Sequence, residues 1–195
     1  TIAVDAGALE GIAVDYVMSH LACAEDADHP MNRQQRELFD ELRTELPPAP
    51  ASLANSGGVF LGPDFHYDLC RPGAALYGVS RSTGAPKNMK QVIGLKGKIL
   101  QVRVVDSEST VGYGATQSVP AGSRLATVAA GYADGYLRSL GNHGHGYAAG
   151  VKVPVVGRVS MDLITFDISA VPPQAIGTGD DIDMICEQHT IDDLA

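Results

Sequence analysis

Short apolar runs alternate with polar and proline-rich segments in the first half of the chain. Residues 14–18 and 51–56 each predict a short strand, and residues 65–70 predict a third strand that ends at Arg71. A helical pattern over residues 33–45 separates the first two of these strands. Because alternation of strand and helix is typical of part of a parallel α/β barrel, we expect that architecture here.

The predicted helix has leucines at i, i+4 and i+8, which indicates one apolar face. These leucines are Leu38, Leu42 and Leu46. Asn32 is a suitable N-cap, since its side chain can accept a hydrogen bond from the free N–H groups of the first turn. The proline-rich segment 47–50 should then end the helix.

The pattern changes after about residue 87. Residues 92–105, 125–130 and 151–168 are runs rich in valine and isoleucine, and glycine-rich or proline-rich turns separate them. Helical periodicity is weak in this half of the chain. The pattern therefore predicts a mostly antiparallel β domain.

The length of 195 residues suits one or two domains. Residues 80–88 are rich in serine, glycine and proline, which predicts the joint between the two halves. We expect a partial barrel over residues 1–87 and a β domain over residues 88–195. The predicted fold class is α/β plus β.

Composition and charge exclude several classes of function. The formal net charge of −9 argues against non-specific binding to nucleic acid, which requires a basic surface. No apolar run approaches the roughly 18–20 residues of a membrane span, and the N-terminus lacks the basic region of a signal peptide. Three widely spaced cysteines do not form a disulfide framework. We expect a protein of the reducing cytoplasm that binds neither nucleic acid nor a membrane.

Residues 68–78 combine three features that suit an anionic ligand. Arg71 ends an apolar run, a Pro-Gly turn follows, and small residues that can start a helix come next. A strand end, a permanent cation and a helix N-terminus are the parts needed to hold a phosphorylated aromatic cofactor. Taken alone, the arginine could instead form an ion pair with Asp68 or another acid.

Other candidate residues each have a structural alternative. Ser56 precedes two glycines and suits a phosphate oxygen, or it belongs to an ordinary turn. His20 and Tyr113 suit proton transfer, or they are a structural histidine and a turn tyrosine. His143 and His145 have no third ligand at a useful spacing, so we expect a polar loop there and no metal site.

Four strings follow one another along the chain. They are Arg-Pro-Gly-Ala-Ala-Leu-Tyr-Gly at 71–78, Val-Gly-Tyr-Gly-Ala-Thr at 111–116, Gly-Tyr-Ala-Asp-Gly at 131–135 and Gly-Arg-Val-Ser-Met-Asp at 157–162. Together they resemble the C-terminal half of an alanine racemase, a pyridoxal-phosphate (PLP) enzyme. The resemblance implies the C-terminal part of a PLP-binding TIM-type (β/α)8 barrel, followed by the β domain. It departs from the family at Ser160, where many members have cysteine.

The resemblance also implies how the barrel part holds the cofactor. Arg71 would hydrogen-bond the pyridine nitrogen, and because arginine keeps its proton, that nitrogen would stay largely unprotonated. Ser56 and the backbone N–H groups of Gly73 and Ala74 would bind the phosphate. His20 would donate a hydrogen bond to the cofactor-bound arginine.

Further roles fall in the β domain. By resemblance, Tyr113 removes the α-proton of L-alanine in the partner subunit's site, and His20 links it to the arginine there. Tyr132 lines the substrate entrance, and the backbone at Met161 holds the substrate carboxylate, although methionine taken alone is more often core filler. The simpler interpretation of Asp134 is a brace for its own turn.

The implied activity is PLP-dependent interconversion of L-alanine and D-alanine by two bases. The implied setting is a cytoplasmic homodimer that supplies D-alanine for peptidoglycan. None of the lysines occurs in the motif of the family's Schiff-base lysine, and the chain does not start with methionine, so we expect an inactive C-terminal fragment. The alternatives are a racemase of another small amino acid, a non-catalytic PLP-binding relative and a free-standing β interaction domain.

Overall fold

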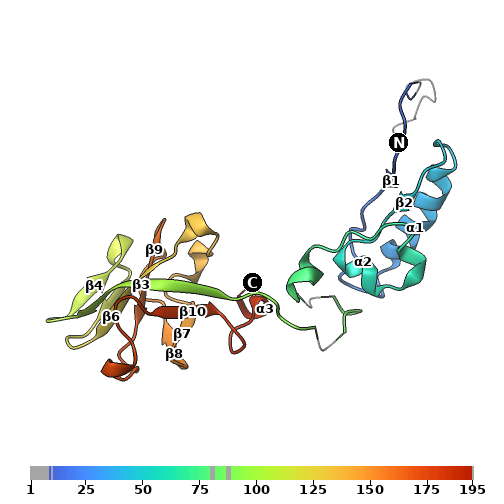
Figure 1. Cartoon of the computed structure of the whole chain (residues 1–195). Coiled ribbons are helices and arrows are strands. Elements are labelled where there is room, and N and C mark those ends of the chain that lie inside the picture. The colour runs from blue at the N-terminus through green and yellow to red at the C-terminus, as the bar shows by residue number, and fades with distance from the viewer. Residues whose placement is uncertain (1–8, 10, 80–81, 87–88, 195) are drawn as a thin grey trace. The chain divides into compact units, whose positions relative to one another are not determined.

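The computed structural model describes residues 9, 11–79, 82–86 and 89–194. The chain divides into two compact units, Thr1–Val92 and Ile93–Ala195, which run from blue to green and from green to red in Figure 1. Each unit has a buried core of its own. Of the expected joint, residues 82–86 are described, whereas 80, 81, 87 and 88 lie outside the described residues. The boundary between residues 87 and 88 stays a prediction.

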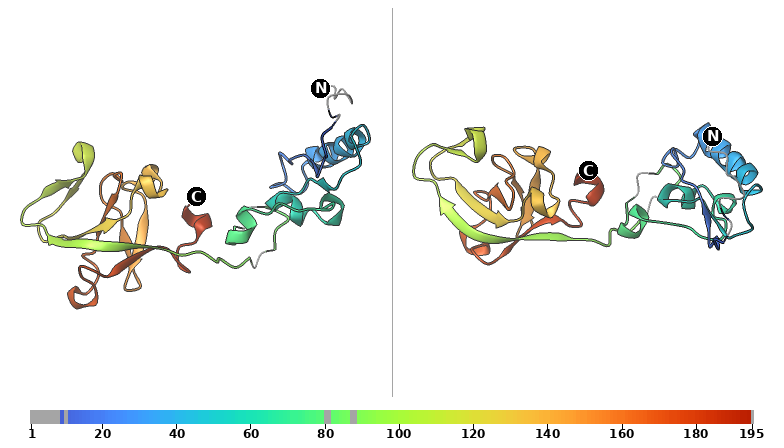
Figure 2. Two further views of the ribbon diagram at one scale, coloured as in Figure 1. Left: turned by 45° about the horizontal axis from the view of Figure 1, so that its top comes forward. Right: turned by 90° about the horizontal axis from the view of Figure 1, so that it is seen from above.

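The first unit contains a strand–helix–strand arrangement. β1 (Val17–Met18) pairs in parallel with β2 (Ala51–Ser52), and α1 (Pro30–Arg43) lies between them in the chain. Neighbouring parallel strands must be joined by a crossover connection of this kind, and an α/β barrel is built from such units. Three short helices follow: α2 (Ser56–Phe60), η2 (Pro63–Phe65) and η3 (Ala74–Tyr77). Figure 2 shows these helices following one another after β2.

The predicted helix is confirmed, but its cap differs from the prediction. Pro30 occupies the first turn, where its missing N–H costs nothing, and His29 is the N-cap. The Nδ1 atom of His29 accepts a hydrogen bond from the backbone N–H of Met31 at 3.2 Å. Asn32 lies inside the helix, where its buried side chain donates to the backbone oxygen of Asp26 at 2.8 Å.

The buried face of α1 also differs from the predicted leucine stripe. Leu38 and Leu42 are 53% and 46% exposed, whereas Phe39 is buried. The ring of Phe39 packs edge-on against Tyr67, with 5.3 Å between ring centroids. Because aromatic side chains bury the largest apolar areas, this contact with a distant segment sets which face turns inward.

The third strand, expected over residues 65–70, does not form. Phe65 ends η2, and Tyr67 adopts a left-handed backbone with φ of +51°. The backbone N–H groups of Asp68 and Leu69 then both donate to the carbonyl oxygen of Ala51, at 3.0 and 3.2 Å. A ladder needs alternating partners, so the segment runs beside β2 without becoming a strand.

The second unit is a six-stranded antiparallel sheet in the order β8-β7-β10-β3-β6-β9, which confirms the predicted β domain. Its strands are β3 (Leu95–Val104), β6 (Arg124–Ala129), β7 (His145–Ala148), β8 (Val151–Pro154), β9 (Leu163–Asp167) and β10 (Asp181–Ile185). β3 is the long light-green arrow of Figure 1. The sheet is curled, so that its two edge strands approach each other. A bridge between Val155, just after β8, and Phe166 in β9 shows this approach.

Alternate residues of these strands face the core. Val128 and Ile164 are direct cross-strand partners, as are Ala126 and Phe166, and all four are buried. Cross-strand apolar pairs of this kind stabilise a sheet. Gly97 is needed in β3, because a Cβ atom there would lie 2.2 Å from the side chain of Val128.

A separate hairpin and several short helices complete the second unit. The hairpin consists of β4 (Ser109–Val111) and β5 (Gln117–Val119). The short helices are η4 (Tyr113–Ala115), η5 (Tyr132–Asp134), η6 (Arg138–Leu140), η7 (Pro173–Ala175) and α3 (Ile191–Leu194). Among the described residues, no helix is long and apolar enough to cross a membrane.

Candidate functional site

The first group of candidate residues lies at the carboxyl ends of β1 and β2. Both strands end at the same edge because they are parallel, and active sites of α/β barrels lie at that edge. Ser19 and His20 follow β1, Asn55 and Ser56 follow β2, and Arg71 ends the segment that runs beside β2. The structure therefore brings together residues that are up to about fifty positions apart.

Arg71 is held by neutral groups. Its Nη1 atom donates to the hydroxyl oxygen of Ser52, and its Nη2 atom donates to the backbone oxygen of Ser19 at 2.6 Å. Ser52 is fully buried, and its hydroxyl donates a hydrogen bond to the backbone oxygen of Leu69 at 2.5 Å. The ion pair with Asp68 that the sequence left open is not formed, since that carboxylate accepts from the backbone N–H of Ala51 at 2.8 Å. The guanidinium is thus fixed in place without a neutralising carboxylate from Asp68.

The side chain of Asn55 determines how His20 can bond. Its Oδ1 atom accepts from the backbone N–H of Gly58 at 2.9 Å, and its Nδ2 atom donates to the backbone oxygen of Leu21 at 3.1 Å. With the amide oriented in this way, the Nδ2 atom that lies 3.2 Å from His20 Nε2 is a donor. His20 Nε2 therefore accepts.

The other ring nitrogen of His20 faces Arg71. The separation between His20 Nδ1 and Arg71 Nη2 is 3.5 Å, at the outer limit of a hydrogen bond. A guanidinium has donors only, so the expected bond from His20 to Arg71 cannot form in that direction. Both ring nitrogens face donors, and a neutral imidazole can accept from only one of them. The shorter contact with Asn55 is the one the geometry favours.

Ser56 is the first residue of α2 and connects it to η3. Its Oγ atom accepts from the backbone N–H groups of Gly73 at 2.8 Å and Ala75 at 3.2 Å. Its hydroxyl proton is then available to an anionic ligand. The N–H of Gly73, expected to bind phosphate directly, is directed to Ser56 here, whereas Ala74 lies between the two bonded positions as the first residue of η3.

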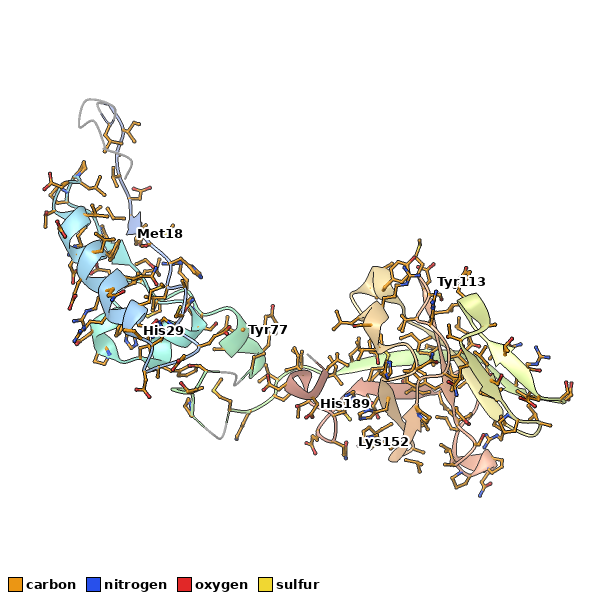
Figure 3. The ribbon with its side chains drawn as sticks, turned by 180° about the vertical axis from the view of Figure 1, so that it is seen from behind. Met18, His29, Tyr77, Tyr113, Lys152 and His189 are labelled. Carbon is orange, nitrogen blue, oxygen red and sulfur yellow. The ribbon has the colours of Figure 1, made fainter. Side chains whose placement is uncertain are left out.

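Tyr113 lies in the second unit, in the exposed loop that connects β4 to β5 (Figure 3). Its side chain is 71% exposed. Gly112 and Gly114 on either side both have φ of +75°, a conformation that favours glycine. A Cβ atom on Gly112 would lie 3.1 Å from the backbone nitrogen of Arg158, so the loop packs closely on that segment.

Tyr132 and Met161 are brought together by backbone contacts. The N–H of Tyr132 donates to the oxygen of Ser160 at 3.0 Å, and the N–H of Ala133 donates to the oxygen of Met161 at 3.0 Å. A Cβ atom on Gly131 would lie 2.1 Å from that Met161 oxygen, so only glycine allows the approach. The side chain of Met161 is 54% exposed, so the core-filler alternative is wrong.

Asp134 and Arg138 complete the surroundings of Tyr132. The carboxylate of Asp134 accepts from the backbone N–H of Gly131 at 2.9 Å, so it braces the turn as the simpler interpretation expected. The guanidinium carbon of Arg138 lies 5.7 Å from the centre of the Tyr132 ring, within the range of a cation–π contact. The tyrosine ring is 39% exposed beside this cation.

The two histidines considered for a metal site do not form a loop pair. His145 begins β7, and its ring stacks on His189 with 4.0 Å between centroids. Burial, then the neighbouring charges of His189 and Lys152, lower the pKa of His145. No cluster of three or more metal-ligating side chains occurs in the described part of the chain.

Sequence reasoning missed two residues that organise these sites. Ser52 is a buried hydroxyl that anchors Arg71, and its only signal is a polar residue inside a short apolar strand. Asn142 links the loop of Tyr113 to the segment before Arg158, and it directly precedes the polar loop expected at His143. Neither role is visible without the tertiary contacts.

The family model of the alanine racemase N-terminal domain matches residues 1–81, and that of the alanine racemase C-terminal domain matches residues 92–195. The chain belongs to the alanine racemase family. It is 54% identical to an alanine racemase of Rhodospirillum rubrum over 92% of this chain and 48% of that protein. It is 47% identical to a catabolic alanine racemase of Mesorhizobium japonicum over 100% of this chain and 50% of that protein.

Solved racemase structures have the same fold. The alanine racemase of Bartonella henselae with covalently bound pyridoxal phosphate matches with a TM-score of 0.79 and 40% identity, over 93% of this chain and 50% of that one. The biosynthetic alanine racemase of Pseudomonas aeruginosa matches with a TM-score of 0.74 and 34% identity, over 92% of this chain and 50% of that one. The chain spans about half the length of these relatives. The predicted family and fold class, part of a PLP-binding barrel followed by a β domain, are confirmed.

Proposed function

We propose that these residues form the C-terminal half of a PLP-dependent enzyme that interconverts L-alanine and D-alanine. The observation that carries the proposal is the fixed guanidinium of Arg71 at the carboxyl edge of β1 and β2, in a chain of the alanine racemase family. The structure of the Bartonella henselae relative contains covalently bound pyridoxal phosphate, which supports the same cofactor here.

The residues of the first unit fit that cofactor. Arg71 presents a donor that keeps its proton at any relevant pH, so it can hydrogen-bond the pyridine nitrogen without protonating it. Ser56 has a hydroxyl proton available to a phosphate oxygen, and the backbone around Gly73 and Ala74 lies beside it. When bound, PLP delocalises the electron pair left at Cα after the proton is removed.

The residues of the second unit supply the remaining roles in this proposal. Tyr113 accepts the α-proton of L-alanine at its phenolic oxygen, in the site of the partner subunit of a homodimer. The backbone of Met161 binds the substrate carboxylate, and Tyr132 lines the entrance. The exposure of Tyr113 and Tyr132 supports their roles, because each side chain must meet a ligand or a partner subunit.

We place the second base, the Schiff-base lysine, outside these 195 residues. Lys96 and Lys98 form cross-strand ion pairs with Asp183 and Asp181, with N–O distances of 3.0 and 2.7 Å. Both lysines lie on β3, and the structure gives them a partner on β10. The lysine would return a proton to the opposite face of Cα. In each turnover one base would remove a proton and the other would donate one.

For the cell, we propose that the enzyme works in the cytoplasm and supplies D-alanine for peptidoglycan. The Pseudomonas aeruginosa relative is called biosynthetic, whereas that of Mesorhizobium japonicum is called catabolic. Deleting the gene should make growth depend on added D-alanine if supply is the role. Growth without D-alanine, in a strain with no second racemase, would contradict it.

The activity is tested on the product of the complete reading frame, incubated with PLP and L-alanine. Chiral chromatography should show D-alanine accumulating until both enantiomers are present in about equal amounts, since they have equal free energies. A folded, PLP-bound protein that forms no D-alanine would overturn the proposal. Racemisation of serine but not alanine would move it to another small amino acid.

A further inference from the structure

Asn142 lies in the connection between η6 and β7, within reach of two other segments. Its backbone has φ of +62°, in the left-handed region that asparagine tolerates better than most residues. Its backbone N–H donates to the carbonyl oxygen of Gly157 at 3.1 Å. The side chain is therefore turned towards the residues before Arg158 by a backbone conformation that is itself unusual.

The amide of Asn142 makes two further hydrogen bonds. The backbone N–H of Gly157 donates to Oδ1 at 2.6 Å, which identifies that atom as the oxygen because an N–H can only donate. The Nδ2 atom then donates to the hydroxyl oxygen of Thr116 at 3.1 Å. Thr116 directly follows η4, the short helix that begins with Tyr113. One side chain thus connects the 157–158 segment to the tyrosine loop.

The tyrosine loop is also held at its two ends, where Val111 pairs with Gln117 in the hairpin of β4 and β5. Tyr113 itself is 71% exposed, so packing of its side chain contributes little to its position. The loop also makes close backbone approaches, which are shown by where an added Cβ atom would lie. Such an atom would lie 3.1 Å from the backbone nitrogen of Arg158 if placed on Gly112, and 2.8 Å from the carbonyl oxygen of Val111 if placed on Gly157. These contacts bring residues 111–112, which precede Tyr113, close to residues 157–158. The hydrogen bond from Asn142 to Thr116 holds the loop at the position after η4.

We infer that Asn142 is a positioning residue for Tyr113, acting through Thr116 and Gly157 to hold the loop from which the phenol projects. The inference rests on the proposed racemase function, in which Tyr113 exchanges the proton on one face of Cα. A misplacement of about 1 Å can reduce a rate by about 100-fold. Loss of the Asn142 hydrogen bonds should therefore slow proton transfer by Tyr113 more than proton transfer by the lysine. These two transfers are called the tyrosine step and the lysine step below.

The test uses the complete enzyme and the variant Thr116→Val, which removes the acceptor for Asn142 Nδ2 and keeps the branched shape. Asn142→Gly removes both amide bonds and still permits a positive φ. Thr116→Ser keeps the hydroxyl and removes only the methyl group. Thr110→Val, in exposed strand β4, is the matched control for the loss of a threonine hydroxyl in the same hairpin.

Rates alone do not separate the two bases. The enantiomers have equal free energies, so kcat/KM must fall equally in both directions. Isotope effects do separate them, because deuterium at Cα of L-alanine is removed by the tyrosine, whereas deuterium at Cα of D-alanine is removed by the lysine. A slower tyrosine step raises the substrate isotope effect from L-alanine and raises the solvent isotope effect from D-alanine.

We expect Thr116→Val and Asn142→Gly to lower kcat roughly 10- to 100-fold with little change in KM. The substrate isotope effect should rise with L-alanine and not with D-alanine, the solvent isotope effect should rise with D-alanine, and Thr116→Ser should show the parent pattern. Thr110→Val should behave as the parent does. Thermal unfolding and PLP absorbance identify any variant that has lost its fold or its cofactor. If Asn142→Gly has lost either, the inference is tested by Thr116→Val alone.

Two results overturn the inference while the parent enzyme still racemises alanine. One is parent-like turnover and isotope effects in Thr116→Val. The other is a loss of rate in which the substrate isotope effects from Cα-deuterated L-alanine and Cα-deuterated D-alanine rise together, as general disturbance of the site would produce. If the parent enzyme forms no D-alanine, the proposed function itself fails, and that outcome is seen before any variant is compared.

Discussion

Single side chains decide the chemistry here through the direction of their hydrogen bonds. Arg71 can only donate, so its partners must be the oxygens of Ser52 and Ser19, and His20 cannot donate to it. The amide of Asn55 is oriented by backbone groups and in turn assigns the acceptor nitrogen of His20. Residue identity showed which groups could act, but the orientation of each came from its neighbours.

Tyr113→Phe in the complete enzyme tests the assignment of the base. The change keeps the ring and removes the phenolic oxygen that would accept the α-proton. General base catalysis contributes roughly 100- to 10,000-fold, so L-to-D turnover should fall by a factor in that range. Chiral chromatography measures it, and Tyr147→Phe, on strand β7, is the matched control. Turnover near that of the parent would remove Tyr113 from the mechanism.

At the scale of elements, long-range contacts changed what local pattern predicted. The leucine stripe of α1 indicated one buried face, yet the contact between Phe39 and Tyr67 buries another. The apolar run at residues 65–70 indicated a strand, yet the left-handed backbone at Tyr67 prevents a regular ladder. The predicted runs 92–105 and 125–130 correspond to β3 and β6, because their alternation agrees with the side of the sheet that is buried. β7 and β10 were not predicted.

The contact between β7 and the turn before α3 should make stability depend on pH. Burial, followed by the charges of His189 and Lys152, lowers the pKa of His145 in the folded chain. The unfolded chain titrates near the ordinary value of about 6.5, so it binds more protons as the pH falls through that value. Stability from this group is present above about pH 6.5 and is lost below it.

Urea unfolding measured between about pH 7.5 and about pH 5 checks this expectation. The midpoint for the parent should fall towards the acid end, and His145→Gln should reduce that slope. His143→Gln is the control, since His143 is exposed two residues away. An unchanged slope in His145→Gln would show that other groups cause the acid sensitivity.

The chain consists of two units, and the second is a more complete fold than the first. The second unit has a curled six-stranded sheet around a large buried core, whereas the first has two paired strands of two residues each. A two-stranded sheet is marginal by itself, and unpaired strand edges favour aggregation. The first unit therefore depends more on further chain than the second does.

We expect the 195-residue chain alone to be catalytically inactive. It contains Tyr113 but no lysine in the family's Schiff-base motif, and its barrel part is a single strand–helix–strand arrangement. Chiral chromatography after incubation with PLP and L-alanine should detect no D-alanine above a protein-free blank. The complete enzyme at equal concentration is the positive control. D-alanine formed by the short chain would contradict the expected need for the missing base.

The amino-acid sequence was enough to predict the family, the order of the two folds and the identities of the residues that can carry the chemistry. Motif residues and strand alternation are local properties, so Arg71, Tyr113, Tyr132 and Met161 could be selected without a structure. The folded chain was needed to show which face of α1 is buried, which atoms Arg71 and His20 contact, and that Asn142 reaches the tyrosine loop. Those outcomes depend on the distances and orientations of groups far apart in the chain, which no local pattern contains.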